Sequence, residues 1–427
     1  MSSESPSSRG GRLGRLYRDA AFQVMNALVG FALVNVVLYV VFPPVQPPRG
    51  IPLTGPDYEV IKRRFVTSRA FEKLEPFFPS LSHEDVVQLM LETYGRPFAY
   101  ESFTEFLERP FHGRFYNVDP AGFRRTSAQG PWPPDPRHEN VFVFGGSTTF
   151  GIGVPDDDTV PAALQEFLTA ALGREVPVYN FGRGHYFSTQ ERVLFEKLLV
   201  AGAAPHVAVF LDGINDFDNA TGLPFLTPFL RDMVDGRAGK CPSPILALAQ
   251  GLPIGRLALR LRDAVGRPLV RNPRQEGTPA PAAPAPRTPE DIAHTVIARY
   301  LENKKMTDAV AAAYGVRTVF VLQPLPNYRY DQSYHLFRIE GAHAAAAPGY
   351  AELERRGAAR ELGPNFVSCA GIQEERREPL YVDQHHYSPA MSRYLARCIA
   401  AAMLERGIAD AARADCGTRR ALRRARR

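Results

Sequence analysis

The sequence predicts an α/β domain whose parallel β-sheet is covered by helices on both faces. From residue 141 onward, short apolar runs alternate with segments of helical length and spacing, the order that produces such sheets. The first run, 141–144, is wholly apolar and ends at two glycines, as a buried parallel strand does. Ser147, Gly182 and Asn215 each follow a predicted strand, at the edge where sites in such sheets lie.

The elements of this domain follow in order along the chain. The predicted strands are residues 141–144, 176–180, 207–211 and 317–322. The predicted helices are residues 160–172, 188–199, 289–314 and 387–406. The third helix has the clearest start, because Thr288 is a capping residue, Pro289 suits the first turn and two acids follow. We expect the domain to span 141–410 with an insertion at 223–289, of which 273–289 is a low-complexity, disordered loop.

Residues 20–42 predict a membrane-spanning helix near the N-terminus. The run contains no charged side chain, and about 20 helical residues cross a bilayer core of about 30 Å. Four arginines precede it, whereas only Arg49 lies within the eighteen residues that follow, a bias that places residues 1–19 in the cytoplasm and the body outside. A cleaved signal peptide is the alternative, but this run is longer than a signal core and no A-x-A pattern follows it. In a bacterium the anchor would lie in the inner membrane and the body in the periplasm.

Between the membrane segment and the sheet, residues 43–140 predict a stalk followed by a mainly helical extension. The stalk, 43–56, is rich in proline and is expected to be extended. In the extension, the segment SHEDVVQLMLETYG has a cap at Ser82, acids in its first turn and a stop at Gly95. These signals are typical of one short helix.

The positive charge of the chain is concentrated at its C-terminus. The chain carries a net charge of +6, and residues 413–427 alone contain seven Arg and one Asp, so the remainder is neutral overall. Without a basic folded face or a recognition helix, nucleic acid is not the expected partner. Two interpretations of the basic tail, 411–427, remain open: a solvated terminus, or a segment that contacts anionic lipid head groups.

The cysteines predict no metal site. The chain has four, at Cys241, Cys369, Cys398 and Cys416. No CxxC pair and no Cys/His cluster with zinc spacing occurs among them. An even number permits two disulfides in an oxidising compartment, and the sequence leaves their pairing open.

Four short segments supply the groups that ester chemistry needs. They are GGST with Ser147, NFGRG with Gly182, GIND with Asn215, and DQHH with Asp383 and His386. A serine hydroxyl becomes a nucleophile when a base takes its proton, and His386 can do so while Asp383 holds its other ring nitrogen. The backbone N–H groups of Ser147 and Gly182 and the side-chain amide of Asn215 could stabilise the negative oxygen that forms.

These four segments, in this order, resemble the four blocks of the SGNH hydrolase family, also called GDSL esterases. The resemblance covers roughly residues 141–406 and implies a three-layer, flavodoxin-like α/β fold and ester hydrolysis without a cofactor. It implies the nucleophile, acid, base and oxyanion donors already named, with Ser147 also an oxyanion donor. The segment NVDPAGFRR, before the first block, is similar to the corresponding segment of membrane-anchored bacterial members.

The blocks also depart from the family pattern and contain additional polar residues. The family usually has Asp before the serine, where this chain has Gly146. His385 adjoins His386, but the DxxH spacing selects His386 as the base, and His385 is expected to line or leave the cleft. Arg183 and His185 lie in the second block and either contact substrate or face solvent. The histidine pair lacks an evident further ligand group, so no metal is expected here.

The sequence thus predicts a serine-dependent esterase that hydrolyses acyl esters through an acyl-enzyme, on cell-surface glycans or lipids. Two alternatives remain open. Transfer of the acyl group to a sugar hydroxyl would use the same residues and is not separable from hydrolysis by sequence. A retained fold that serves as a non-catalytic binding module is disfavoured by the complete set of active-site residues. The insertion at 223–289 either covers part of the cleft or is a surface excursion.

Overall fold

The computed structural model divides into two units. The first comprises Met1–Pro47 and Pro228–Ala283, and the second comprises Pro48–Thr227 and Pro284–Arg427. The structure describes residues 7–41, 56–67, 69, 71–135, 138–228, 230, 288–337, 339, 343 and 345–408. The predicted stalk, most of the predicted insertion and the basic tail therefore lie outside the described residues.

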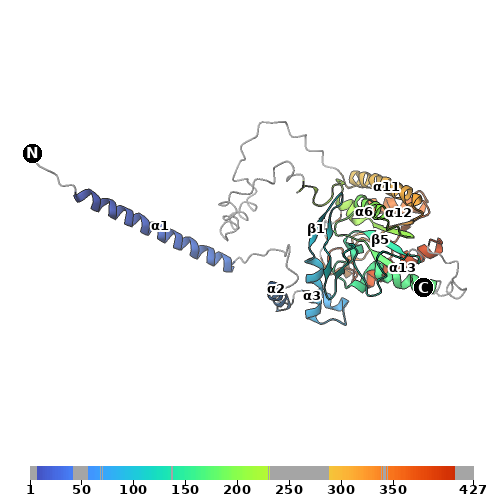
Figure 1. The fold of residues 1–427 in the computed structure, drawn as a ribbon, viewed down its shortest axis with the longest axis horizontal. Helices are drawn as coiled ribbons and strands as arrows, with labels where there is room; N and C mark the ends of the chain where they lie inside the picture. The colour runs from blue at the N-terminus through green and yellow to red at the C-terminus, as the bar shows by residue number, and fades with distance from the viewer. Residues whose placement is uncertain are drawn as a thin grey trace, which may run out of the picture. The chain divides into compact units, whose positions relative to one another are not determined.

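The first unit contains one long helix, α1 (Ser7–Val41) (Figure 1). Within it, the 21 residues Tyr17–Val37 have a mean hydropathy of 1.8 and are long enough to cross a membrane. A signal sequence meets the same criteria, so the segment is a membrane span or a signal sequence. The helix begins earlier than the apolar run, because residues 7–19 of the predicted tail are already helical.

The second unit is built on a five-stranded parallel sheet with the strand order β6-β5-β7-β8-β9. The strands are β5 (Val141–Gly145), β6 (Val178–Asn180), β7 (Val207–Asp212), β8 (Arg317–Leu322) and β9 (Phe366–Ser368). Every pairing between neighbours is parallel. The predicted α/β class is confirmed, and the carboxyl ends of all strands meet at one edge of the sheet.

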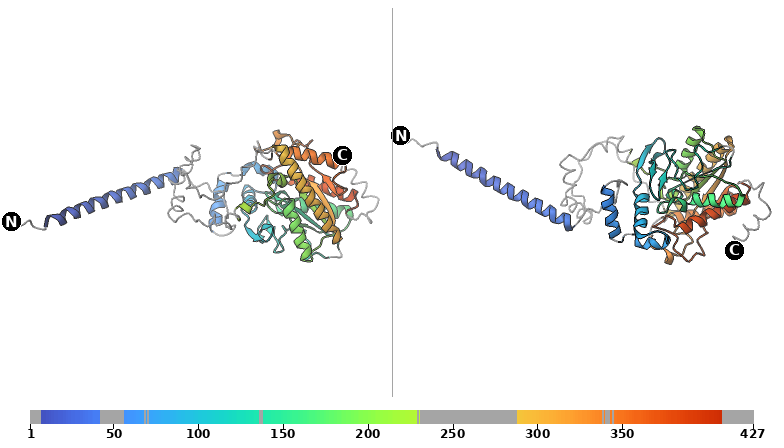
Figure 2. Two further views of the ribbon diagram at one scale, coloured as in Figure 1. Left: turned by 90° about the horizontal axis from the view of Figure 1, so that it is seen from above. Right: turned by 60° about the horizontal axis from the view of Figure 1, so that its bottom comes forward.

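Side chains of the sheet alternate between two apolar cores. In β5, Val141 and Val143 belong to one cluster, while Phe142 and Phe144 belong to the other, because successive strand residues point to opposite faces. Helices cover both faces of the sheet, so the domain has three layers (Figure 2). The valine face is covered by α5 (Val160–Leu172) and α13 (Pro389–Glu405), and the phenylalanine face by α6 (Ser188–Val200), α11 (Pro289–Ala313) and α12 (Ala346–Ala358).

Most elements of this domain lie where the sequence predicts them. Helix α5 and strand β8 have the predicted bounds, and α11 begins at a capping box formed by Thr288 and Asp291. Strand β9 and helix α12 were not predicted. The remaining short elements of the domain are α4 (Ser147–Phe150), η2 (Asp156–Asp158), α7 (Ile214–Asp218) and η3 (Gln332–Tyr334).

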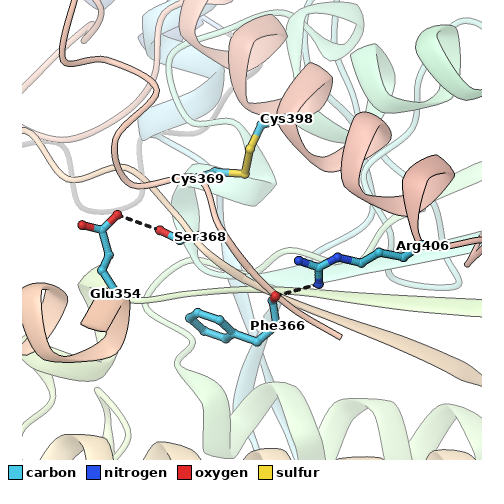
Figure 3. Close-up of a disulfide and its surroundings, with 6 residues drawn as sticks. All are labelled: Glu354, Phe366, Ser368, Cys369, Cys398 and Arg406. Carbon is cyan, nitrogen blue, oxygen red and sulfur yellow. Dashed lines mark hydrogen bonds between the residues drawn. A yellow bond between two sulfur atoms is a disulfide. The ribbon is translucent and has the colours of Figure 1, made fainter. Parts of the chain in front are cut away.

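A disulfide joins the chain after β9 to helix α13 (Figure 3). It pairs Cys369 with Cys398, which are 29 residues apart in sequence. The bond identifies one of the disulfides whose pairing the sequence left open. Cys241 and Cys416 lie outside the described residues.

The extension that precedes the sheet is helical in its first half and carries short strands in its second. Its helices are α2 (Pro56–Thr67), η1 (Glu72–Phe77) and α3 (His83–Tyr94), and its strands are β1 (Phe98–Glu101), β2 (Glu105–Glu108), β3 (Phe111–His112) and β4 (Asn117–Val118). Helix α3 has the predicted cap, because Ser82 and Asp85 form a reciprocal capping box. Its Leu89 and Met90 pack in one cluster with Val382 of the sheet domain, so the extension and the sheet share a core.

Candidate active site

Ser147 lies at the first turn after strand β5. The strand ends at Gly145, Gly146 caps the turn, and Ser147 begins the short helix α4 with only 7% of its surface exposed. A Cβ atom on Gly146 would lie 2.0 Å from Asn215 Nδ2. The departure from the family pattern therefore has a local reason, because the Asn215 amide occupies the space that a side chain at residue 146 would need.

Asn215 reaches the same edge from strand β7. The strand ends at Asp212, and Gly213, with a φ of 137°, turns the chain into α7. Asn215 Nδ2 donates a hydrogen bond of 2.7 Å to the Tyr186 carbonyl oxygen. The amide thus lies between the turn that carries Ser147 and the loop after β6, where a negatively charged oxygen could accept its second N–H.

Gly182 contacts the nucleophile turn, and its own N–H is engaged. The N–H donates to Asn180 Oδ1 at 3.0 Å. A Cβ atom on Gly182 would lie 2.4 Å from the backbone nitrogen of Phe150. A glycine is therefore required here for close packing against α4.

His185 lies in the same loop and has a left-handed backbone conformation, with a φ of 63°, which is uncommon for a residue other than glycine. The amides around it are bonded: Arg183 N–H to the Gly145 carbonyl and Gly184 N–H to Glu108 Oε1. Within the described part of the chain, the His185 N–H has no hydrogen-bond acceptor. Its imidazole stacks on Phe225 with 4.2 Å between ring centroids.

Asp383 and His386 form a hydrogen-bonded pair on the turn before α13. His386 Nδ1 lies 2.5 Å from Asp383 Oδ2, and Asp383 Oδ1 accepts the backbone N–H groups of His385 and His386. Burial opposes ionisation of Asp383, but the charge of His386 and the hydrogen bond from its ring outweigh it, so the pKa of Asp383 is lowered. The pair therefore presents an ionised carboxylate to a histidine held in one tautomer.

One glutamine side chain links the turn of the nucleophile to the turn of the base. Gln323 Oε1 accepts a hydrogen bond of 2.6 Å from Thr148 Oγ1 and another of 3.0 Å from the Tyr387 hydroxyl. Thr148 and Tyr387 immediately follow Ser147 and His386. The structure thus brings the two segments together, while His386 Nε2 is buried with no hydrogen-bond partner among the described residues. That nitrogen is the one that would take the serine proton.

Two further histidines lie beside the base. The His385 ring lies 4.3 Å from the His386 ring and 5.4 Å from the His343 ring, measured between centroids. Burial and the neighbouring His386 lower the pKa of His385 to about 3, so it is neutral at physiological pH. His343 Nδ1 pairs with Asp218 Oδ1 at 2.7 Å, and its Nε2 is buried without a partner among the described residues.

The acid and the two adjacent histidines also have the side-chain types of a metal site. Asp383, His385 and His386 each offer a ligand atom, and these atoms lie within 4.8 Å of one another. Asp383 Oδ2 and His386 Nδ1, however, already bind each other. The arrangement fits an acid–base pair with a neighbouring imidazole.

The extension contacts three of the four backbone segments that form the site. The hydroxyl of Tyr94 donates to Asp383 Oδ2, and Glu108 accepts the Gly184 N–H at 2.8 Å. The guanidinium of Arg124 donates to the carbonyl oxygens of Phe150, at the end of α4, and Val154, after it. Sequence reasoning missed these contacts, although Tyr94 and Arg124 lie in the segments SHEDVVQLMLETYG and NVDPAGFRR.

A cavity among the described residues lies elsewhere. It has a volume of about 610 Å³ and is lined by residues of α12, β9 and the end of α13, among them Glu354, Phe366, Ser368 and Arg406 near the disulfide (Figure 3). Glu354 accepts a hydrogen bond from Ser368, and Arg406 donates to the Phe366 carbonyl oxygen. These polar groups satisfy one another and belong to the wall of the domain.

Comparison with known proteins gives similar structures but no similar sequences. No family model matches the chain, and no curated protein matches it in sequence. Similar solved structures include an α/β hydrolase enzyme from the metagenome of Lake Arreo, at 17% identity and a TM-score of 0.34, over 62% of this chain and 94% of that one. An acetylxylan esterase from Geobacillus stearothermophilus has 16% identity and a TM-score of 0.33, over 63% and 94% of the two chains.

A member of the lipolytic protein G-D-S-L family from Veillonella parvula has 11% identity and a TM-score of 0.33, over 62% of this chain and 97% of that one. All these TM-scores lie under 0.5, so the function proposed below depends on the geometry of the site. The three similar structures are thus an α/β hydrolase, an acetylxylan esterase and a protein of the lipolytic G-D-S-L family.

Proposed function

We propose that this protein is a serine-dependent ester hydrolase that works through an acyl-enzyme. The observation that carries the proposal is the shared Gln323 oxygen, which ties the Ser147 turn to the His386 turn. It is supported by the ionised Asp383 on His386 Nδ1 and by His386 Nε2, which has no hydrogen-bond partner in the described part of the chain. A hydroxyl, an imidazole and a carboxylate in this order are what nucleophilic catalysis by serine requires.

In the first half of the reaction, Ser147 Oγ attacks the ester carbonyl carbon while His386 Nε2 takes the serine proton. The C–O bond to the leaving alcohol then breaks, and His386 returns the proton to that alcohol. In the second half, His386 takes a proton from water, whose oxygen attacks the acyl-enzyme. The acid leaves when the bond to Ser147 Oγ breaks and the proton returns to the serine. Asp383 stabilises the imidazolium in both halves.

The negative oxygen of each intermediate needs donors, and we assign them to three segments. The Ser147 N–H and the Asn215 amide keep the roles that the sequence predicted, supported by the contact of Asn215 with Gly146. For the loop after β6, the engaged N–H of Gly182 makes it the weaker candidate. The N–H of His185 is free among the described residues and adjoins Tyr186, whose carbonyl binds Asn215, so we assign the third donor to His185.

The body of the protein is proposed to work outside the cytoplasm, anchored by the apolar segment of α1 with its N-terminus inside. The disulfide between Cys369 and Cys398 supports export, since such bonds persist in oxidising compartments. Fusing a reporter enzyme that is active only after export to the C-terminus tests this topology. An active reporter is expected, and its inactivity would contradict the proposal.

Replacement of the nucleophile tests the chemistry. Ser147→Ala is expected to lower hydrolysis of p-nitrophenyl acetate by about 10⁴- to 10⁶-fold and to abolish labelling by a fluorophosphonate. Ser80→Ala, at an exposed position of the extension, serves as the control and should behave as the wild type. A wild-type protein that neither hydrolyses esters nor reacts with the probe would contradict the hydrolase function and would favour the alternative of a non-catalytic binding module.

Acyl transfer to a hydroxyl of a glycan is the second candidate. It is favoured by the buried nitrogens of His343 and His385 that have no partner among the described residues, because hydrolysis needs no such additional hydrogen-bonding groups. With an acetyl donor and glycan acceptors, mass spectrometry should then detect acetylated glycan. Release of free acetate alone would exclude transfer to these acceptors.

A further inference from the structure

Helix α3 of the extension ends beside the acid of the candidate active site. Its last residue, Tyr94, donates a hydrogen bond from its hydroxyl to Asp383 Oδ2, across 289 positions of sequence. We propose that Tyr94 is a positioning residue of the active site, which fixes the Asp383 carboxylate and thereby sets the strength of the base, His386. This inference rests on the proposed function.

The hydroxyl of Tyr94 is held in place by a packed helix. Val86, Leu89 and Met90 of α3 lie in the same apolar cluster as Val382, the residue before Asp383. The Tyr94 ring also meets the His386 ring edge to face, with 6.2 Å between centroids and an interplanar angle of 84°. Although 41% of Tyr94 is exposed, its hydroxyl end lies against the carboxylate.

The position of Tyr94 also relates it to the nucleophile. A Cβ atom on Gly153 would lie 2.6 Å from Val382 and 3.8 Å from the Tyr94 hydroxyl. Gly153 follows the α4 helix that begins with Ser147. The hydroxyl therefore lies where the turn of the nucleophile, the turn of the base and the extension meet.

With Tyr94 in place, both oxygens of Asp383 have two donors. Oδ1 accepts the backbone N–H groups of His385 and His386, at 2.9 and 2.8 Å. Oδ2 accepts His386 Nδ1 and the Tyr94 hydroxyl. A carboxylate offers about four acceptor sites, so Asp383 is saturated and its rotation would break bonds. Without Tyr94, the imidazole would be the only donor left on Oδ2 among the residues that the structure describes.

The charge state of Tyr94 suits a donor. Burial, followed by the charge of Asp383 and the hydrogen bond to it, raises the pKa of Tyr94 well above its usual value. The phenol therefore keeps its proton throughout the working pH range. A second donor on Oδ2 withdraws charge from the carboxylate, and it thus moderates the pull of Asp383 on the imidazolium.

Tyr94→Phe removes the hydroxyl and keeps the ring. We expect kcat for p-nitrophenyl acetate to fall about tenfold, as for loss of one hydrogen bond to a charged group, with KM nearly unchanged. The acid limb of the pH–rate profile should move to higher pH, because Asp383 then holds the imidazolium more strongly. Tyr100→Phe is the matched control, since Tyr100 is 73% exposed on β1 of the same extension.

A ring-fluorinated tyrosine at position 94 separates hydrogen bonding from packing. Its phenol is more acidic and a stronger donor, so the acid limb should move to lower pH, opposite to Tyr94→Phe. Acid limbs that do not move, or that move together, would overturn the positioning role. The rate of fluorophosphonate labelling distinguishes failure of this proposal from failure of the proposed function. A wild-type protein that is not labelled would contradict the hydrolase function. A wild-type protein that is labelled at the same rate as Tyr94→Phe would contradict only the role of Tyr94.

Discussion

The sheet domain and the extension contribute to the candidate site in different ways. The sheet domain supplies the reacting groups, since Ser147, Asn215 and His386 all lie at the ends of its strands or at the start of its last helix. The extension supplies side chains that hold those groups, among them Tyr94 and Arg124. The proposed reacting groups lie at the edge of the sheet, whereas the contacts that hold them come from side chains of the extension.

This difference predicts which substitutions should change the reaction rate and which should change the stability of the fold. A substitution in the sheet domain at a reacting group should reduce rate with little effect on folding. A substitution in the extension at a holding group should reduce stability, rate or both, according to how deeply the group is buried. The following predictions test that division, beginning with the largest expected effect.

Arg124→Met should have the largest effect. Arg124 is fully buried, its Nε lies 2.7 Å from Asp156 Oδ1, and it donates to three carbonyl oxygens at or just after α4. Breaking a buried ion pair on one side costs about 3–5 kcal/mol, so urea unfolding should shift by that amount. Arg125→Met is the control, since the side chain of Arg125 is half exposed. Equal unfolding curves for the two variants would show that Arg124 holds nothing.

Asn215→Ala should reduce rate with little loss of stability. Removal of one oxyanion donor costs about 10²- to 10³-fold in kcat, measured on an activated ester. Asn215→Asp keeps the shape but replaces the donating amide by a negative charge, so it should be at least as slow. If Asn215→Asp retained the wild-type rate, the amide would not be a donor to the intermediate.

Asp212→Asn should change how stability depends on pH. Burial, followed by the charge of Asp216, raises the pKa of Asp212, and burial likewise raises the pKa of Glu191 and Asp216. These three carboxylates therefore bind more protons in the folded state than in the unfolded chain, and their contribution to stability is greatest below about pH 4 and falls as pH rises through their folded-state pKa values.

Asparagine cannot ionise, so the gap between unfolding midpoints at pH 5 and pH 8 should narrow. We expect the free energy of unfolding at pH 8 to rise by on the order of 1–3 kcal/mol, which is the typical cost of a buried polar atom without a partner. Glu302→Gln, at a side chain that is 72% exposed, should leave the gap unchanged. An unaltered gap in Asp212→Asn would mean that the buried carboxylates do not titrate together with folding.

Ser82→Ala should have the smallest effect. It removes one half of the capping box of α3, which typically costs about 1 kcal/mol. The cap lies at the opposite end of the helix from Tyr94, so kcat should stay near the wild-type value while the unfolding midpoint falls by a few degrees. A large loss of activity would show that α3 moves as a whole when its first turn loosens. Ser80→Ala again provides the control.

The sheet domain was largely predictable because its signals are local. The apolar run 317–322 and the helix 160–172 need only their own residues to be recognised. Strand β9, by contrast, has only three residues, too few to show a periodic pattern, and the strands of the extension are two to four residues long.

The candidate site was predictable as far as its four motifs reach. Ser147, Asn215, Asp383 and His386 lie in segments of recognisable spacing. The role of Gln323 could not be predicted, because its partners are 175 and 64 positions away and no motif surrounds it. The same reason explains why the contact of Tyr94 with Asp383 was missed.

The disulfide constrains the segment that carries the acid and the base. Both lie on the chain between Cys369 and Cys398, so they belong to a covalently closed ring. Closing a ring of this size removes about 3–4 kcal/mol of chain entropy from the unfolded protein. In a newly made chain that is still exposed to cellular thiols, this ring would be open, so under the proposed topology the disulfide would close around the turn of Asp383 and His386 only after export.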